Sequence, residues 1–220
     1  MSWFGRSPVA LQGLALKSGG TVVSGDERRF HTLLSLVSPD LAGFQGIRFE
    51  RGILWPSQGA VEQAGVAEFQ FKPLNGPPMR RAIGLATLPP ALPTGGLLLL
   101  GPERWDAAHE ARLTSKFTAR IPSGVLDLPS AVTALGHDLS YAVPFAASLP
   151  PLMRSLFLNL RLNLLEWTPN GLWYLAPEHC DIALWQQRAH FLRELATWSA
   201  TQSRVPDLVS STTAARVMRL

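Results

Sequence analysis

The chain has 220 residues, of which 46% are hydrophobic and 16% are charged, and this composition excludes a disordered protein and predicts a sizeable core. The formal net charge is +4, but the basic residues are scattered and mostly single, so we interpret them as solvated surface and not as a nucleic-acid stripe. No apolar run approaches the ~18 residues that span a bilayer, and one cysteine, Cys180, excludes an internal disulfide. We therefore expect a soluble protein of the bacterial cytoplasm.

The first forty residues predict two helices with a short strand between them. Residues 8–18 form the first helix, which ends at a Gly-Gly pair. Ser24 can cap the second helix, and Glu27, three residues later, suits a capping box. The second helix ends at Pro39, and its apolar face is formed by Phe30, Leu33, Leu34 and Val37.

Beyond Phe44 the hydrophobic period changes from 3.6 towards 2, which indicates strands. Alternation over residues 67–72 predicts a strand with one buried and one solvated face, as antiparallel sheets allow. Asn75-Gly76 then predicts a tight hairpin that leads into a strand over residues 80–88. Residues 97–100 are four leucines without polar alternation, so we expect a central strand buried on both faces.

The middle of the chain mixes both periods. Residues 103–113 predict a helical connection, and residues 116–121 predict a strand. Asp127 can cap a short helix over residues 129–135, which Gly136 ends. A further helix runs over residues 149–159, with Ser148 as its cap and Leu152, Leu156 and Phe157 towards the core.

The end of the chain contains the clearest hairpin. Turn-forming residues 168–171 separate two apolar runs, and Trp167 and Trp173 lie on either side of this turn. An amphipathic helix follows over residues 181–199. The predicted fold class is therefore α+β: a mostly antiparallel sheet packed with several helices and ending in this helix. We predict one domain over residues 1–202 and a mobile tail over residues 203–220.

Two groups of side chains could carry chemistry. The run Glu178-His179-Cys180-Asp181 is the densest reactive cluster, but adjacent residues point in different directions and cannot close around one metal ion. We interpret it as a helix cap and predict no metal and no cofactor. A nucleophilic Cys180 is disfavoured by its acidic neighbours. An acid–base site could be assembled from three residues that are distant in the sequence: His137, Asp127 and His179.

Partner-binding candidates come from aromatic and basic residues in irregular contexts. Trp3 and Trp55 lie outside the helical and hairpin spacing that indicates core, so we expect exposed aromatic rings there. Arg80 and Arg81 form an adjacent basic pair that could contact a partner or, less favourably, nucleic acid.

From Lys116 onward the order of signals resembles an uncharacterised bacterial family of domains of unknown function. The resemblance is carried by the strand Phe117-Thr-Ala-Arg-Ile121, the Leu-Pro-Pro helix that begins at Leu149, the hairpin and the closing helix. It implies a fold and no activity.

The sequence leaves three functions open. We expect a non-catalytic cytoplasmic interaction or accessory domain, which binds a protein or a second copy of itself, and the sequence identifies no small-molecule ligand. The alternatives are an enzyme with a site assembled from His137, Asp127 and His179, and a weak, non-specific nucleic-acid binder.

Overall fold

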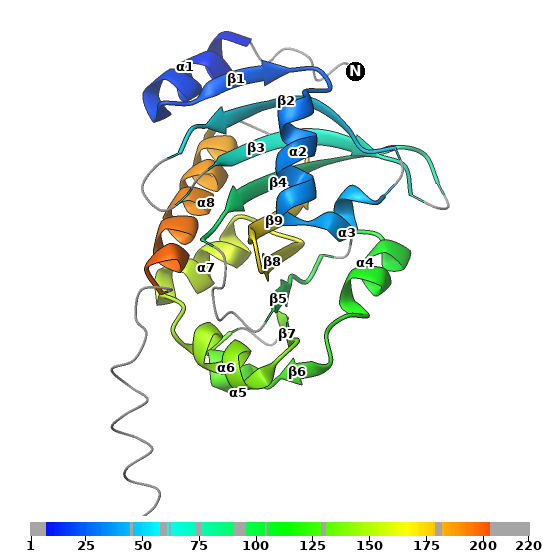
Figure 1. The fold of residues 1–220 in the computed structure, drawn as a ribbon, viewed down its shortest axis with the longest axis vertical. Coiled ribbons are helices and arrows are strands. Elements are labelled where there is room, and N and C mark those ends of the chain that lie inside the picture. The colour runs from blue at the N-terminus through cyan, green and yellow to red at the C-terminus, as the bar shows by residue number, and fades with distance from the viewer. Residues whose placement is uncertain are drawn as a thin grey trace, which may run out of the picture.

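A single antiparallel sheet forms the centre of the protein in the computed structural model, which describes residues 8–44, 46–57, 61, 63–73, 76–89, 96–103, 105–128, 131–178 and 182–202. The sheet has nine strands in the order β1-β2-β3-β4-β9-β8-β5-β7-β6 (Figure 1). The strands are β1 Thr21–Ser24, β2 Arg48–Trp55, β3 Ala64–Phe71, β4 Met79–Thr87, β5 Leu97–Leu100, β6 Ala119–Ile121, β7 Thr133–Gly136, β8 Leu164–Thr168 and β9 Gly171–Pro177.

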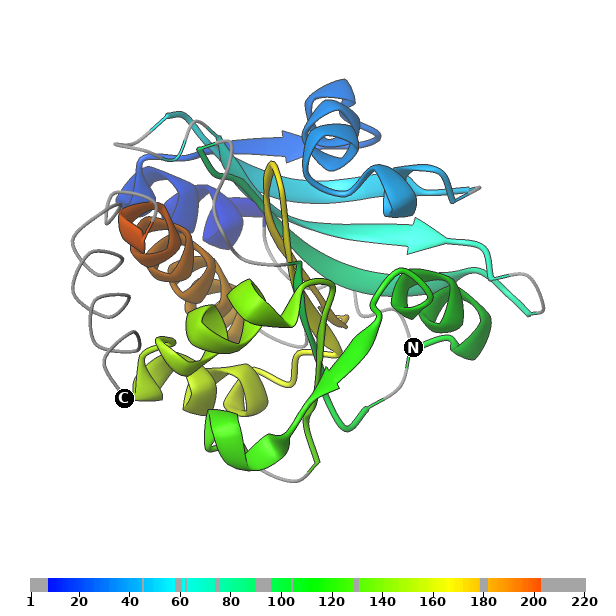
Figure 2. The same ribbon diagram turned by 60° about the horizontal axis from the view of Figure 1, so that its bottom comes forward.

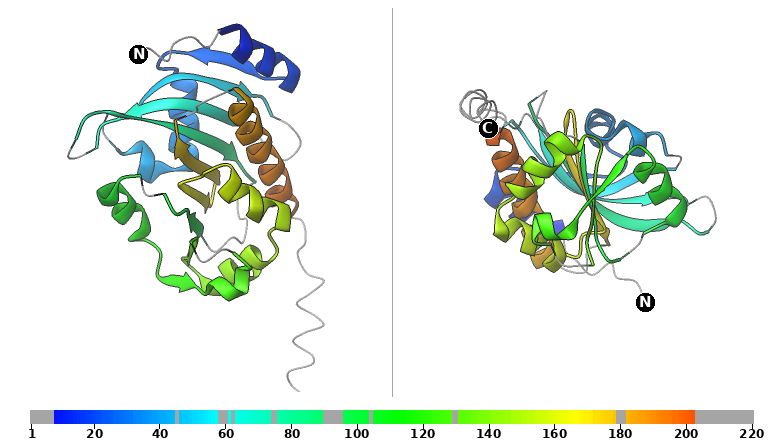
Figure 3. Two further views of the ribbon diagram at one scale, coloured as in Figure 1. Left: turned by 180° about the vertical axis from the view of Figure 1, so that it is seen from behind. Right: turned by 90° about the horizontal axis from the view of Figure 1, so that it is seen from below.

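Helices cover both faces of this sheet, which confirms the predicted α+β class. On one face lie α2 (Arg28–Val37), α3 (Pro39–Ala42) and α4 (Ala107–Thr114). The opposite face packs against α1, α6, α7 and α8, and the view from behind in Figure 3 shows α8 crossing it. The helices on this face are α1 Pro8–Ser18, α6 Leu139–Ala147, α7 Pro151–Asn159 and α8 Ile182–Gln202. A short helix, α5, covers Ser123–Leu126.

The last strand lies in the interior of the sheet. β9 pairs with β4 on one side, where Leu85 is opposite Trp173, and with β8 on the other, where Glu166 is opposite Trp173. The first four strands follow one another in sequence order, whereas β5 lies between β8 and β7. The sheet is strongly twisted, as the view from below in Figure 3 shows. β9 therefore joins the two halves of the chain.

Several sequence predictions are confirmed. The first helix has the predicted bounds, and the apolar face predicted for the second helix is buried. All four leucines of β5 are buried, as a strand between two neighbours requires. The hairpin turn between β8 and β9 is also where the turn residues placed it, and Trp167 and Trp173 are fully buried.

Two predictions around residue 130 are wrong. Thr133–Gly136 is strand β7, because its backbone groups pair with β5 on one side and β6 on the other. Asp127 does not cap a following helix; it ends α5 in the left-handed conformation, with φ of 48°. Helix α6 follows His137, in a segment for which we predicted no helix. The carboxylate of Asp138 caps this helix by accepting from the amide of Ser140 at 2.9 Å. Figure 2 shows α6 and α7 side by side.

Helix starts and burial account for the remaining differences. Ser24 ends β1 instead of capping α2, and Glu27 occupies the cap position without a side-chain hydrogen bond that caps the helix. Ser148 ends α6 and does not begin α7. Leu152, which we expected to face the core, lies in the first turn of α7 and is 65% exposed.

Candidate functional site

Of the catalytic candidates named from the sequence, the structure describes His137 and Asp127, and among the described residues no hydrogen bond or ion pair joins their side chains. Asp127 and His137 are both exposed; Asp127 precedes β7 and His137 follows it. Within the described residues the hydrogen bonds of His137 are made by its backbone, to Gly96 and Thr118. His179, Cys180 and Trp3 lie outside the described residues. Among the described residues no group of three His, Cys, Asp or Glu side chains could hold a metal ion.

Trp55 is buried, with 3% of its surface exposed, so the expectation of an exposed ring there is wrong. Its indole N–H donates to the hydroxyl of Ser18 at 2.9 Å, and the guanidinium of Arg193 lies 5.7 Å from its ring centroid. Helix α1 therefore closes over the ring. The adjoining depression, with a cavity volume of about 20 Å³, has room for a water molecule and not for a metabolite.

Arg80 and Arg81 point to opposite faces of the sheet, because neighbours on a strand alternate. Arg80 lies 3.2 Å from the carboxylate of Glu50 and 3.9 Å from that of Glu178. Arg81 faces the side of α2 and α4, and none of the ion pairs within the described part of the chain includes it. The two arginines thus do not form one basic patch. The prediction that the chain does not bind nucleic acid stays a prediction.

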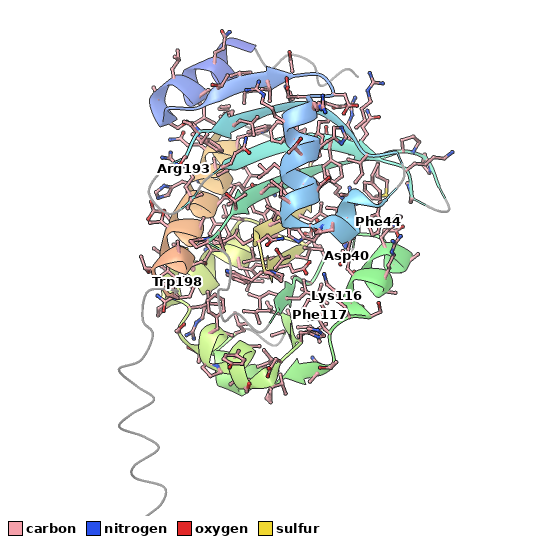
Figure 4. The ribbon with its side chains drawn as sticks, viewed as in Figure 1. Asp40, Phe44, Lys116, Phe117, Arg193 and Trp198 are labelled. Atoms are coloured by element: carbon pink, nitrogen blue, oxygen red, sulfur yellow. The ribbon has the colours of Figure 1, made fainter. Side chains whose placement is uncertain are left out.

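A carboxylate–lysine cluster around the buried Glu166 lies where α3 and the turn after α4 meet the sheet. The ammonium of Lys116 is 2.6 Å from Glu166 on β8 and 2.8 Å from Asp40 on α3. The second carboxylate oxygen of Glu166 accepts from the indole of Trp173 at 3.0 Å. Figure 4 shows Asp40 and Lys116 next to one another, with Phe117 beside them. The cluster fastens two helical segments to the middle of the sheet.

Burial controls the ionisation of this cluster. The side chain of Glu166 is 2% exposed, and desolvation raises its pKa although Lys116 and Trp173 act in the opposite direction. Burial lowers the pKa of Lys116, but the carboxylates of Glu166 and Asp40 together outweigh it and hold that pKa above its ordinary value. A carboxyl group with a raised pKa can act as an acid or base. Here, however, both of its oxygens already accept hydrogen bonds from the protein.

A second buried carboxylate repeats this design on the other face. Glu68 on β3 accepts from the guanidinium of Arg51 at 2.6 Å and from the indole of Trp185 at 3.4 Å. We expected Glu68 on a solvated face, which is wrong: α8 covers that face, so the carboxylate is 3% exposed and needs both donors. Sequence reasoning missed both clusters. The signal was present in Leu-Leu-Glu-Trp, residues 164–167, where a single acid interrupts an apolar strand.

The comparisons with known proteins identify a fold and no family. No protein-family model and no curated protein matches this chain. Among solved structures it is similar to the crystal structure of the mycobacterial trehalose monomycolate transport factor A, TtfA, with a TM-score of 0.50 and 11% sequence identity. The match covers 87% of this chain and 94% of that chain. At this identity the likeness shows a shared fold alone.

Proposed function

We propose that this chain is a non-catalytic accessory domain that acts by binding a partner protein. The observation that carries the proposal is that the buried ionisable side chains bond to other parts of the fold. The buried carboxylates Glu68 and Glu166 are bonded to cations and indoles that hold elements together. The exposed His137 and Asp127 stand on separate segments.

One comparison supports this role, because the protein whose fold is shared is named as a transport factor. Within the described residues no helix is long and apolar enough to cross a membrane. The bacterial cytoplasmic setting belongs to the proposal as well, supported by the single cysteine in 220 residues. The kinship with a bacterial family of domains of unknown function stays a prediction.

The test separates binding from catalysis. The full chain is tagged in cells that naturally produce it, cross-linked mildly, and its bound proteins are quantified by mass spectrometry. We expect a protein that also binds the purified chain directly, with a measurable Kd. In parallel, the purified chain is incubated with a small-molecule extract of the same cells. Turnover that is lost in His137→Ala or Asp127→Asn would show an enzyme and contradict the proposal.

A further inference from the structure

Arg81 lies at a polar end of an aromatic layer. On β4 it is opposite Phe69 of β3 and Pro177 of β9. Along the same face the ring of Phe71 packs 6.0 Å from Phe69 and 5.5 Å from Trp105. Most of this layer is covered by α2, α3 and α4, whereas the Arg81 side chain is half-buried and reaches the surface.

The hydrogen bonds of Arg81 leave one edge of its guanidinium unused. Nη1 donates to the carbonyl of Arg80 at 2.9 Å. Nε is buried and has no acceptor among the described residues, and Nη2 is neither bonded to them nor buried. The Nε–Nη2 edge is the one that a carboxylate grips with two parallel hydrogen bonds. The buried indole N–H of Trp105 also lacks an acceptor within the described structure.

The carboxylates nearest to Arg81 do not neutralise it. Desolvation lowers the pKa of Arg81, and this effect exceeds the opposing charges of Glu178, Asp106 and Glu103. Each of these acids already contacts another side chain. Glu178 lies 3.9 Å from Arg80, Asp106 lies 2.6 Å from His109, and Glu103 lies 2.8 Å from Arg161. Arginine cannot release its proton in a protein, so the guanidinium remains an undercompensated cation.

We infer that Arg81 is the docking point for a carboxylate carried by the partner protein. The inference rests on the proposed function and specifies the chemistry of the partner. A carboxylate supplies two acceptors in the spacing that the free edge requires. Glu178, Asp106 and Glu103 repel a phosphate dianion more strongly than a singly charged carboxylate.

The Nε–H is covered in the unliganded protein, so binding requires a neighbouring side chain to move. Met79 is half-exposed and lies two residues earlier on the same face of β4, so its flexible side chain is the one that we expect to move.

The test uses ¹⁵N-labelled full-length chain and the side-chain N–H signals of arginine and tryptophan. Sodium acetate is the probe, and sodium phosphate and sodium chloride at equal ionic strength are the comparisons. The signal of Arg81 is assigned by its loss in Arg81→Gln, and that of Trp105 by its loss in Trp105→Phe. We expect acetate to shift both signals saturably, and the Trp105 shift to need at least about tenfold more acetate in Arg81→Gln. Arg120→Gln, at an exposed position on β6, is the matched control and leaves the acetate response unchanged.

Arg81→Lys keeps the charge but has no paired donors, so acetate affinity falls in that variant too. A melting temperature at or above that of the wild type shows that Arg81→Gln and Arg81→Lys are folded. The inference is overturned by an acetate shift that does not saturate, by an equal shift in Arg81→Gln, or by tighter binding of phosphate. A partner captured equally well by Arg81→Gln also overturns it and leaves the accessory role intact. If Arg81 binds acetate but no protein partner is found, the accessory role is contradicted and the carboxylate site at Arg81 is not.

Discussion

Glu166 is a carboxyl group removed from water in the middle of a sheet, and its charge depends on one lysine. Lys116 approaches from the partly exposed side, and Trp173 donates from the neighbouring strand. A buried ion that loses its partner costs more than the pair contributed, because the desolvation penalty remains. The same argument holds for Glu68 with Arg51 on the opposite face.

We expect Glu166→Gln to change how stability depends on pH. Burial raises the pKa of Glu166 in the folded protein above its ordinary value of 4.5, so the folded state holds this proton more tightly than the unfolded chain does. The stabilising contribution is complete below that ordinary value and is lost as pH rises through the raised pKa. In urea unfolding from pH 4 to 8, the stability of Glu166→Gln relative to wild type should therefore increase with pH. A difference that stays constant or decreases would contradict the raised pKa. The aspartates with lowered pKa values contribute equally to the stability of both proteins, so their contributions cancel in this difference.

Gly84 on β4 is required by close packing and not by its backbone conformation. A methyl group at this position would meet the ring of Tyr174, a fully buried residue on β9. We expect Gly84→Ala to lower the free energy of unfolding by about 1–3 kcal/mol. Gly13→Ala is the matched control: it lies inside α1 with nothing within 4 Å, so it should raise stability by about 0.5–1 kcal/mol. Urea unfolding of both variants measures the contrast, and equal effects would refute this explanation.

At the scale of elements, Arg188 holds the last helix against two segment ends. The guanidinium of this buried α8 residue donates to the carbonyl of Leu160, after α7, at 2.9 and 3.1 Å. It also donates to the carbonyl of Pro177, at the end of β9, at 2.9 Å. The bonds to Leu160 are buried and the bond to Pro177 is partly buried, so the arginine takes the place of solvent as a donor to both carbonyls.

We expect Arg188→Leu to destabilise the protein by about 2–4 kcal/mol, because it leaves these carbonyls without their donor. Arg188→Lys should recover little of the loss, since one ammonium cannot reproduce the fork that spans both carbonyls. His190→Ala, on the exposed face of the same helix, should remain within about 0.5 kcal/mol of wild type. Chemical unfolding of the three variants tests this, and a stable Arg188→Leu would show that the contacts add nothing.

At the scale of the whole molecule, the position of β9 makes one cooperative unit the expected behaviour. The two core clusters lie on opposite faces of one sheet, and β9 contributes side chains to both: Tyr174 to one and Trp173 to the other. Removing either half of the chain would expose a long interior edge of β4 or β9.

We therefore expect urea unfolding in a single transition, with the same midpoint by far-UV circular dichroism and by tryptophan fluorescence. Deleting residues 203–220 should leave that midpoint unchanged, if the tail is as mobile as predicted. Two separate midpoints would show two domains, and a lowered midpoint in the deletion variant would show that the tail packs on the fold. Until these measurements the boundary at residue 202 stays a prediction.

For the candidate site, sequence and structure contribute differently. The sequence singled out Arg81, but only as half of a basic pair with Arg80, and strand alternation separates the two. The Lys116–Glu166 contact joins residues fifty positions apart, so no local pattern could predict it. The burial of Trp55 was also beyond sequence reasoning, because Ser18 and Arg193 approach its ring from distant parts of the chain.

What the sequence determined by itself was local. Turn residues 168–171 specified the β8–β9 hairpin, and four leucines without alternation specified a strand buried on both faces, because both signals depend on neighbouring residues alone. The tertiary structure alone decided that Thr133–Gly136 is a strand and that β9 lies between β4 and β8. Both depend on hydrogen-bond partners far away in the sequence, and only the folded sheet brings these partners together.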